Sequence, residues 1–318
     1  MKIINEISIA FYGTPQFSLK FLEHLFTKKV KISYIVSQPP KTSGRGRMIE
    51  MSAVHKWAKK KDITVFTPRS MDDHEFLKKV SKINVDLNII VAYGNILTDK
   101  IINLPSYMSI NVHASLLPRW RGAAPIQRAI LAKDKEIGVS IIKVEKKLDA
   151  GPILLEKKII LGKEDNHGSV NEKIILEGKV LLERAIIKIV NNEINYKIQD
   201  ENLVTYAHKI NKSECKILWE NDALSISQQI KAFSPYPGAW TIMKNSNLRI
   251  KILKAEIIKK KENEENKVFM IGDINKNFEV KCGKNFLKIE ILQREGKKPT
   301  NAKDFLNGMK SNNLSFSK

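Results

Sequence analysis

The stretch Leu87–Ala92, which reads LNIIVA, decides the fold class of this chain of 318 residues. It is short and almost wholly apolar, the pattern of a strand that is buried on both faces of a parallel sheet. Met108–Val112 has the same texture. Strand-like and helix-like segments alternate around these two runs through the first 190 residues, and such alternation is typical of βαβ units. The sequence therefore predicts an α/β fold with a Rossmann-like, doubly wound and mostly parallel sheet.

The other elements of this sheet follow from hydrophobic periodicity. Further strands are expected at Ile7–Tyr12, Ile32–Val36, Ile63–Phe66, Gly138–Val144 and Ile153–Leu161. Helices are expected at Phe17–Phe26, Ser52–Lys60, Asp72–Val80, Ala124–Leu131 and Val170–Val190. Thr14 is suited to cap the first helix, with Pro15 at its first position. The segment Gln38–Met48, rich in Gly, Pro and Arg, is expected to be a loop.

The texture of the chain changes after about residue 191. Asn191–Thr205 is polar and resembles a linker in composition. Short strand-like runs follow at Arg249–Ile252, Lys267–Ile271, Phe278–Cys282 and Phe286–Leu292. Short strands separated by turn residues predict a small, OB-like β-barrel. We therefore expect a first domain over residues 1–190, a linker over 191–205 and a C-terminal β-barrel domain over 206–318.

Charge and composition narrow the class of protein. Lys and Arg together number 55 and Asp and Glu 34, a formal net charge of +21, and a field this positive attracts polyanions, above all nucleic acid. Two cysteines, Cys215 and Cys282, are too few for a disulfide framework. No uncharged apolar run approaches the ~18–20 residues of a membrane span. We expect a cytoplasmic protein that contacts no membrane.

Two common nucleotide-binding motifs are missing from the sequence. The turn after the first strand has one glycine, Gly13, where a dinucleotide site needs several for a tight turn and close approach to the pyrophosphate. The missing glycines disfavour a plain nucleotide-binding Rossmann module. No phosphate-binding G-x-x-x-x-G-K-[ST] motif occurs either, which disfavours a nucleoside triphosphatase. The six histidines show no metal-ligand spacing, so no metal is expected.

Asn111 and His113 are the first candidates for catalysis. They lie two residues apart at the carboxyl end of an expected strand, so their side chains share one face, and ligands of open α/β sheets bind beyond such strand ends. An amide beside an imidazole can stabilise an oxyanion and move a proton. Asp149 lies at a turn from which it could orient the imidazole. By spacing alone, a hydrogen-bonded core histidine and an Asx-turn aspartate remain open alternatives.

The stretch Ser115–Gln127, together with Asn111-x-His113 and Leu148-Asp149-Ala150-Gly151, resembles the signature of the folate-dependent formyltransferases, and among them the members that act on methionyl-tRNA. The resemblance extends over nearly the whole chain. It continues in Phe11–Pro15, Gln38-Pro39, Gly44-Arg45-Gly46, Val91–Leu97, Tyr206–Ile210, Phe233–Trp240 and Asp304–Gly308.

The resemblance implies transfer of a formyl group from 10-formyltetrahydrofolate to the α-amino group of methionine on initiator tRNA. Asn111, His113 and Asp149 match the family's catalytic trio, with Asn111 and protonated His113 on the oxyanion and Asp149 helping to relay the amine's proton. By the same resemblance, the residues that bind folate are Tyr93, Gly94, Ile96, Leu97, Ser115, Leu116, Leu117 and Pro118. Those that bind tRNA are Lys41, Arg45, Arg47 and Lys209, the last in a basic C-terminal domain. A monomer without metal is the expectation.

The chain departs from the family pattern at three positions. Pro40 replaces an Asp, Thr98 replaces a Pro, and Lys147 stands where a glycine usually precedes Leu-Asp. The last change bears on the turn before Asp149, since Gly tolerates positive φ and Lys does not readily. Two other functions remain as alternatives: a formyltransferase for a sugar-nucleotide amine, or a catalytically inactive RNA-binding protein on the same scaffold. An intact trio argues against the second.

Overall fold

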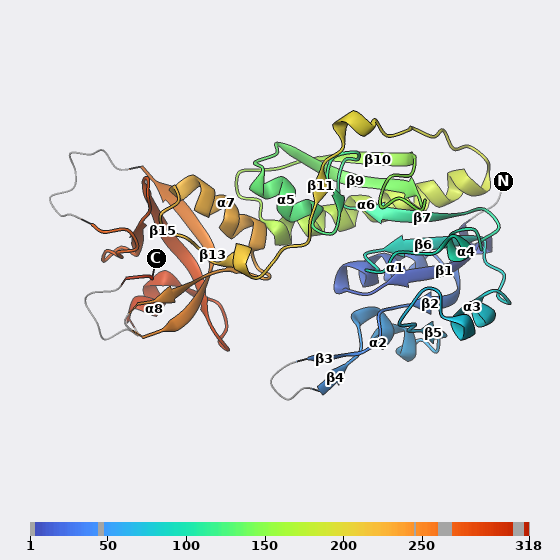
Figure 1. Ribbon diagram of the computed structural model, residues 1–318, viewed down its shortest axis with the longest axis horizontal. Helices are drawn as coiled ribbons and strands as arrows, with labels where there is room; N and C mark the ends of the chain where they lie inside the picture. Colours follow the sequence, from blue (N-terminus) through green and yellow to red (C-terminus); the bar gives the residue numbers. More distant parts are fainter. Residues whose placement is uncertain (1–3, 44–47, 245, 260–268, 308–314, 318) are drawn as a thin grey trace. The chain divides into compact units, whose positions relative to one another are not determined.

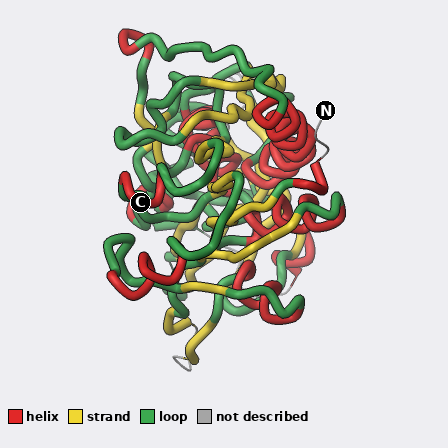
Figure 2. The backbone as a smooth tube through the Cα atoms, turned by 90° about the vertical axis from the view of Figure 1, so that its right-hand side faces the viewer, coloured by secondary structure: helices red, strands yellow, loops and turns green. Residues whose placement is uncertain are grey.

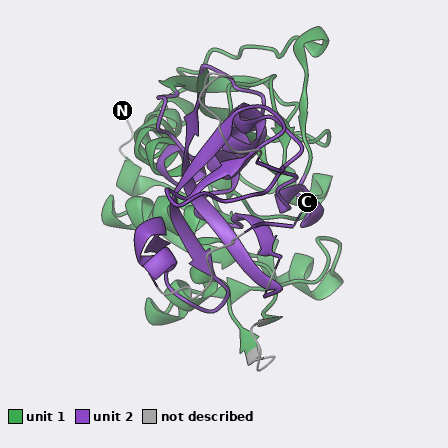
Figure 3. Ribbon diagram, turned by 90° about the vertical axis from the view of Figure 1, so that its left-hand side faces the viewer, with its two compact units in different colours: residues 1–125, 136–160, 171–208 green, residues 126–135, 161–170, 209–318 purple. Residues whose placement is uncertain are grey.

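The computed structural model of the chain describes residues 4–43, 48–244, 246–259, 269–307 and 315–317. These residues form two compact units (Figure 3). The first comprises residues 1–125, 136–160 and 171–208, and the second comprises 126–135, 161–170 and 209–318. The boundaries expected from the sequence, at 190 and 206, stay predictions.

A seven-stranded sheet forms the centre of the first unit (Figure 1). Its order is β10-β9-β7-β6-β1-β2-β5, with β1 at Ser8–Gly13, β2 at Lys31–Val36, β5 at Val65–Phe66, β6 at Leu87–Val91, β7 at Met108–His113, β9 at Glu136–Lys143 and β10 at Ile153–Ile160. The strands from β7 to β5 pair in parallel, and β9 and β10 are antiparallel additions. The predicted Rossmann-like, mostly parallel sheet is confirmed.

The central strands are buried on both faces, as LNIIVA predicts. All five residues of β6 are buried. On one face, Ala10, Tyr12 and Ile90 pack against side chains of α3 (His74–Val80) and α4 (Asp99–Ile102). On the other face, α1 (Gln16–Thr27) contacts β1 and β6. The remaining helices around this sheet are α2 at Ala53–Lys60, α5 at Pro125–Leu131 and α6 at His167–Val190.

Two local predictions in this unit were wrong. Pro15, expected at the first position of α1, is instead its N-cap residue, and Thr14 makes no cap but donates its hydroxyl to the carbonyl of Tyr93 at 3.0 Å. The segment expected to be a loop carries a short hairpin of β3 (Lys41–Ser43) and β4 (Met48–Glu50). Each of these strands has only three residues, which is too few for an alternating pattern of apolar and polar residues to be recognised in the sequence.

Several short elements lie outside the two main sheets. A two-stranded parallel pair joins β8 (Arg121–Gly122) to β11 (Tyr206–Ala207). Turns of 3-10 helix lie at Ile4–Glu6, Glu201–Leu203 and Ser213–Cys215. Figure 2 traces helices and strands along the described backbone.

The second unit has an antiparallel sheet of five strands in the order β12-β13-β15-β14, with β16 also paired to β15. Its elements are β12 at Ala239–Met243, β13 at Leu248–Ile258, β14 at Glu279–Lys281, β15 at Phe286–Arg294 and β16 at Thr300–Asn301, with α7 at Ala223–Phe233 and α8 at Ala302–Asn307. Trp219 anchors its core by stacking on Phe316, with ring centroids 5.2 Å apart.

The predicted strand at Lys267–Ile271 was wrong in its described part. Residues 269–271 form no strand, and the backbone N–H of Met270 instead donates to the carboxylate of Asp273 at 2.9 Å. In the part of the chain that the structure describes, no helix is both long and apolar enough to cross a membrane.

Candidate active site

The amide of Asn111 and the imidazole of His113 lie at the carboxyl end of β7, as the spacing predicts. In the antiparallel register with β9, Asn111 is opposite Ile142 and His113 is opposite Ser140. The parallel neighbour β6 ends at the same edge of the sheet. The His113 side chain is only 6% exposed, so the ring is held by protein groups and not by bulk water.

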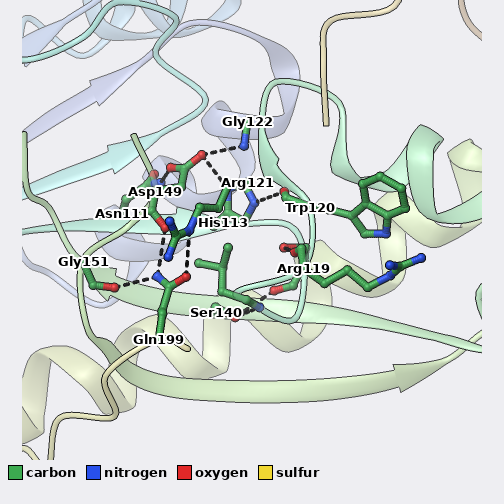
Figure 4. A network of polar contacts seen from close by, with 12 residues as sticks. Asn111, His113, Arg119, Trp120, Arg121, Gly122, Ser140, Asp149, Gly151 and Gln199 are labelled. Carbon is green, nitrogen blue, oxygen red and sulfur yellow. Dashed lines mark hydrogen bonds and ion pairs between the residues drawn. The ribbon is translucent and has the colours of Figure 1, made fainter. Parts of the chain in front are cut away.

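Asp149 meets both of these side chains from the turn between β9 and β10 (Figure 4). Its Oδ1 accepts a hydrogen bond from Asn111 Nδ2 at 3.1 Å, and its Oδ2 accepts one from the backbone N–H of Gly122 at 2.9 Å. The same Oδ2 lies 3.5 Å from His113 Nδ1. Both carboxylate oxygens therefore accept hydrogen bonds from other elements, one from β7 and one from the loop at Gly122. Asp149 is not the residue of a local Asx-turn.

Both ring nitrogens of His113 face oxygen acceptors. Nε2 lies 2.8 Å from the carbonyl oxygen of Trp120, and Nδ1 faces Asp149. A neutral imidazole has one N–H and can donate to only one of these, whereas an imidazolium donates to both. The ring is therefore held between a carbonyl and a carboxylate, which is more than a core histidine satisfied by one neighbour.

The loop that supplies these partners needs unusual backbone conformations. Trp120 has φ +65° and Gly122 has φ +116°. A Cβ on Gly122 would lie 2.9 Å from the carbonyl oxygen of Ala207, so both the φ angle and the space call for glycine there. Residues held in such conformations persist where the surroundings over-determine them, as they commonly do at functional sites.

The replacement of the family's glycine by Lys147 does not strain the turn. The left-handed residue of this turn is Asp149, at φ +50°, and Lys147 is not at positive φ. The Lys147 ammonium instead forms an ion pair with Glu201 at 2.5 Å. The turn is thus built without a glycine at position 147.

Sequence reasoning missed a second layer of polar groups behind Asp149. Gln199 and Arg121 are buried and hydrogen-bonded to each other, and Gln199 also binds the backbone of the Asp149 turn. The guanidinium of Arg121, followed by the ammonium of Lys147, lowers the pKa of Glu201 to about 2. Arg121 stood in the quoted motif, but its burial gave no sign in the sequence. Gln199 stood in a stretch that looked like a linker.

The residues expected to bind folate fall into two groups. Ser115, Leu117, Tyr93 and Leu97 are buried, and Leu116 packs against the position of Gly138. Ser115 donates to the carbonyl of Arg119 at 2.7 Å, and Pro118 follows Leu117 through a cis peptide bond. Gly94 and Ile96 are exposed, Ile96 by 72%.

A cavity of about 290 Å³ opens on the first unit between α4, the beginning of β7 and the end of β9. Its lining includes Asp99, Asn103 and Tyr107. None of the eight expected folate residues lines it. Residues 143–146, which precede the Asp149 turn in the chain, also line the cavity.

The structure describes two of the four residues expected to bind tRNA. Lys41 is exposed in β3, and Lys209 is exposed just beyond β11. Arg45 and Arg47 lie outside the described residues. Among the residues that the structure does describe, no group of three His, Cys, Asp or Glu side chains is placed to hold a metal ion.

Models of known protein families match both halves of the chain. A sequence model of the family described as "Formyl transferase" matches residues 5–186, and one described as "Formyl transferase, C-terminal domain" matches residues 209–310. The methionyl-tRNA formyltransferase of Methylococcus capsulatus is 38% identical over 299 residues, which are 94% of this chain and 96% of that protein.

Solved structures share the fold at low identity. An N-formyltransferase from Helicobacter canadensis, solved with folinic acid and dTDP-3-aminofucose, matches with a TM-score of 0.61 at 17% identity, over 91% of this chain and 99% of that one. HypX from Aquifex aeolicus in complex with tetrahydrofolic acid matches with a TM-score of 0.62 at 13% identity, over 98% of this chain. The chain spans about half the length of HypX, or 51%.

Proposed function

This chain belongs to the formyl transferase family, among the methionyl-tRNA formyltransferases, and on that premise we propose how its residues carry out the transfer. The enzyme moves a formyl group onto the α-amino group of methionyl-tRNA. The formyl donor is 10-formyltetrahydrofolate and the acceptor is the initiator tRNA. The observation that carries the residue assignment is the contact of one carboxylate, Asp149, with both Asn111 and His113.

The reaction forms one bond and breaks another. The methionine amine attacks the formyl carbon, a tetrahedral oxyanion forms, the bond from that carbon to N10 of the folate breaks, and the amine's proton ends on N10. Asn111 Nδ2 carries two hydrogens, and one of them is hydrogen-bonded to Asp149. The second is available to the oxyanion, and one such donor contributes ~3–4 kcal/mol to an acyl-transfer transition state.

His113 and Asp149 act as a pair in this proposal. The imidazolium adds positive charge beside the developing oxyanion, and the carboxylate holds the ring in orientation. The Asp149 carboxylate accepts the amine's proton and returns it to the leaving nitrogen, N10 of the folate. The Trp120 carbonyl fixes the far side of the ring, because it accepts from Nε2 at 2.8 Å.

We assign the folate to the edge of the sheet that carries Tyr93, Gly94, Ile96 and Leu97 on one side and Ser115–Pro118 on the other. Exposed Ile96 offers an apolar surface to a flat ring. Gly94, at φ +96°, leaves backbone groups accessible because it has no side chain. The chemistry expected of this segment is apolar contact with backbone hydrogen bonds, as in most ligand sites.

The acceptor tRNA is assigned to the basic groups of both units. Arg45, Arg47 and Lys41 are assigned to the acceptor stem, because an arginine fork binds phosphates and base edges. Lys209 adds positive charge at the start of the C-terminal domain. Most of the +21 net charge then attracts the tRNA and makes its binding depend on salt, but does not determine which tRNA is the substrate. The proposed form is a cytoplasmic monomer.

The direct test offers the chain three amine acceptors and one donor. With 10-formyltetrahydrofolate, charged initiator tRNA should yield formyl-methionine, and elongator methionyl-tRNA should react poorly. A dTDP-linked amino sugar serves as the third acceptor, because a sugar formyltransferase shares this fold. Formylation of the sugar without formylation of methionyl-tRNA would overturn the proposal. Binding of tRNA without any transfer would favour an inactive RNA-binding protein.

A further inference from the structure

We propose that Gln199 is a positioning residue for formyl transfer, because its side-chain amide holds the turn that presents Asp149 to His113. Gln199 precedes β11 by seven residues, in the stretch that the composition marks as a linker. Its side chain bonds to Arg121 and to the backbone of Asp149 and Gly151, and not to Asn111 or His113, so its effect on the reaction passes through Asp149. The inference rests on the proposed formyl transfer and adds a residue to it.

One nitrogen of Gln199 ties together both sides of the turn (Figure 4). Nε2 donates to the carbonyl oxygen of Asp149 at 2.9 Å and to the carbonyl oxygen of Gly151 at 2.7 Å. The two protons of that nitrogen are therefore both used, one on each side of Ala150. Gln199 is 6% exposed, so water does not compete for these bonds.

The orientation of the Gln199 amide is fixed by its neighbours. Its Oε1 accepts from Arg121 Nε at 3.0 Å, and an arginine can only donate. The two backbone carbonyls can only accept, so oxygen and nitrogen of the amide cannot exchange places. Arg121 is fully buried, and its Nη2 donates to Glu201 Oε1 at 2.8 Å. A chain of hydrogen bonds thus runs from Glu201 through Arg121 and Gln199 to the backbone of Asp149.

Asp149 needs such support because of its conformation. It is a non-glycine residue at φ +50°, and the left-handed region is held only where surrounding contacts over-determine it. Gly122 binds the carboxylate and Gln199 binds the carbonyl of the same residue. Gly122 follows Arg121 directly, so one short strand, β8, is connected to Asp149 by both routes.

The most informative variant is Gln199→Glu, which keeps the shape of the side chain and replaces the donating NH2 group by an oxygen that can only accept. A carboxylate oxygen would then face the carbonyls of Asp149 and Gly151, which repel it, while the contact to Arg121 remains. We expect the turn to shift and kcat to fall on the order of 10- to 100-fold, the scale of a misplacement of about 1 Å. The KM values for folate and tRNA should change little, because Gln199 contacts neither proposed binding region.

Gln199→Met and Lys197→Ala complete the set. Gln199→Met loses both bonds to the turn without adding charge, and it should lower kcat in the same way; it also serves if Gln199→Glu does not fold. Lys197→Ala lies two residues away and removes an exposed ion pair with Glu156, so it should leave kcat unchanged. Thermal unfolding of all variants separates loss of stability from loss of turnover.

A double-mutant cycle decides whether Gln199 acts through Asp149. In single-turnover reactions with enzyme in excess, Gln199→Glu should slow transfer in the wild-type background and have almost no further effect on an Asp149→Asn background. Equal losses in both backgrounds, or an unchanged kcat in Gln199→Glu and Gln199→Met, would overturn the inference. Failure of the wild-type chain to formylate methionyl-tRNA would instead overturn the proposed function.

Discussion

His113 Nδ1 lies 3.5 Å from Asp149 Oδ2, within a pair whose side chains are 6% and 10% exposed. Because both side chains are shielded from water, neighbouring protein groups and not solvent hold them in orientation. The pair joins the end of a strand to a turn 36 residues further along the chain, so folding of the sheet assembles it.

Replacement of His113 or Asp149 by alanine should remove transfer and spare binding. We expect kcat to fall by a factor on the order of 10² to 10³ or more in each, because the oxyanion loses its charged partner or the ring loses its orientation. The affinity for tRNA should stay near the wild-type value in a filter-binding assay. Unchanged turnover in either variant would remove that residue from the catalytic trio.

Gly151→Ala should damage the site through sterics alone. Gly151 is not at positive φ, but a Cβ there would lie 1.9 Å from the carbonyl oxygen of Lys143. The turn must shift, and we expect lower kcat together with a lower melting temperature. Gly162→Ala is the matched control, since its nearest neighbour is a flexible Asp165 side chain at 3.3 Å. Equal kcat for Gly151→Ala and wild type would show that the turn tolerates displacement.

Arg45→Ala should affect tRNA far more than folate. Loss of a bidentate contact to a base or phosphate typically costs 1–3 kcal/mol, so KM for initiator tRNA should rise about 10-fold or more. Arg69→Ala controls for loss of one exposed positive charge from the first unit. Steady-state kinetics with each substrate varied in turn gives both KM values. An equal rise in the two would argue against a tRNA role for this arginine.

Glu201→Gln should lower stability in a way that depends on pH. Hydrogen bonds from Arg121 and then Lys147 hold the pKa of Glu201 at about 2, below the ordinary 4.5. A depressed pKa contributes stability above the unfolded value and loses it as pH falls toward the folded value. The melting temperature of the variant should therefore lie below wild type at pH 7, with a difference that narrows below about pH 4.5.

The measurement for Glu201 is a pair of melting curves at each pH step. Glu193→Gln, an exposed glutamate just beyond α6, controls for the change of net charge. A gap between wild type and Glu201→Gln that stayed constant from pH 7 to pH 3.5 would contradict the prediction.

The strands could be predicted because burial on both faces leaves a plain signal in the residues. LNIIVA became β6, with five buried residues, and the run at Met108 became β7. Elements held together by distant partners left no such signal. Strand β12, Ala239–Met243, depends on its register with β13, and the hairpin β3–β4 depends on three paired residues a side. Local periodicity does not carry that information.

Of the candidate site, too, only the residues that belong to a local sequence pattern could be predicted. Period two along a strand placed Asn111 and His113 together, and the motif around Asp149 suggested the third member; the structure brings all three side chains into contact. Their catalytic roles remain predictions. Arg121 and Gln199 could not be found, because they are joined across 78 residues by one hydrogen bond. Burial of a polar residue is a property of the folded molecule and is not visible in a polar stretch of sequence.

The hydrogen bonds that Lys197–Ala207 makes with the rest of the first unit limit how this stretch can change in length. A polar, linker-like segment is ordinarily where insertions and deletions accumulate, but tolerance depends on the hydrogen bonding of the backbone. Here Lys197 pairs with Ile153, Gln199 with the Asp149 turn, and β11 with β8. A length change inside this run would break the register of these pairs, so selection on the rate of formyl transfer would remove it. Variation in length is expected before residue 197.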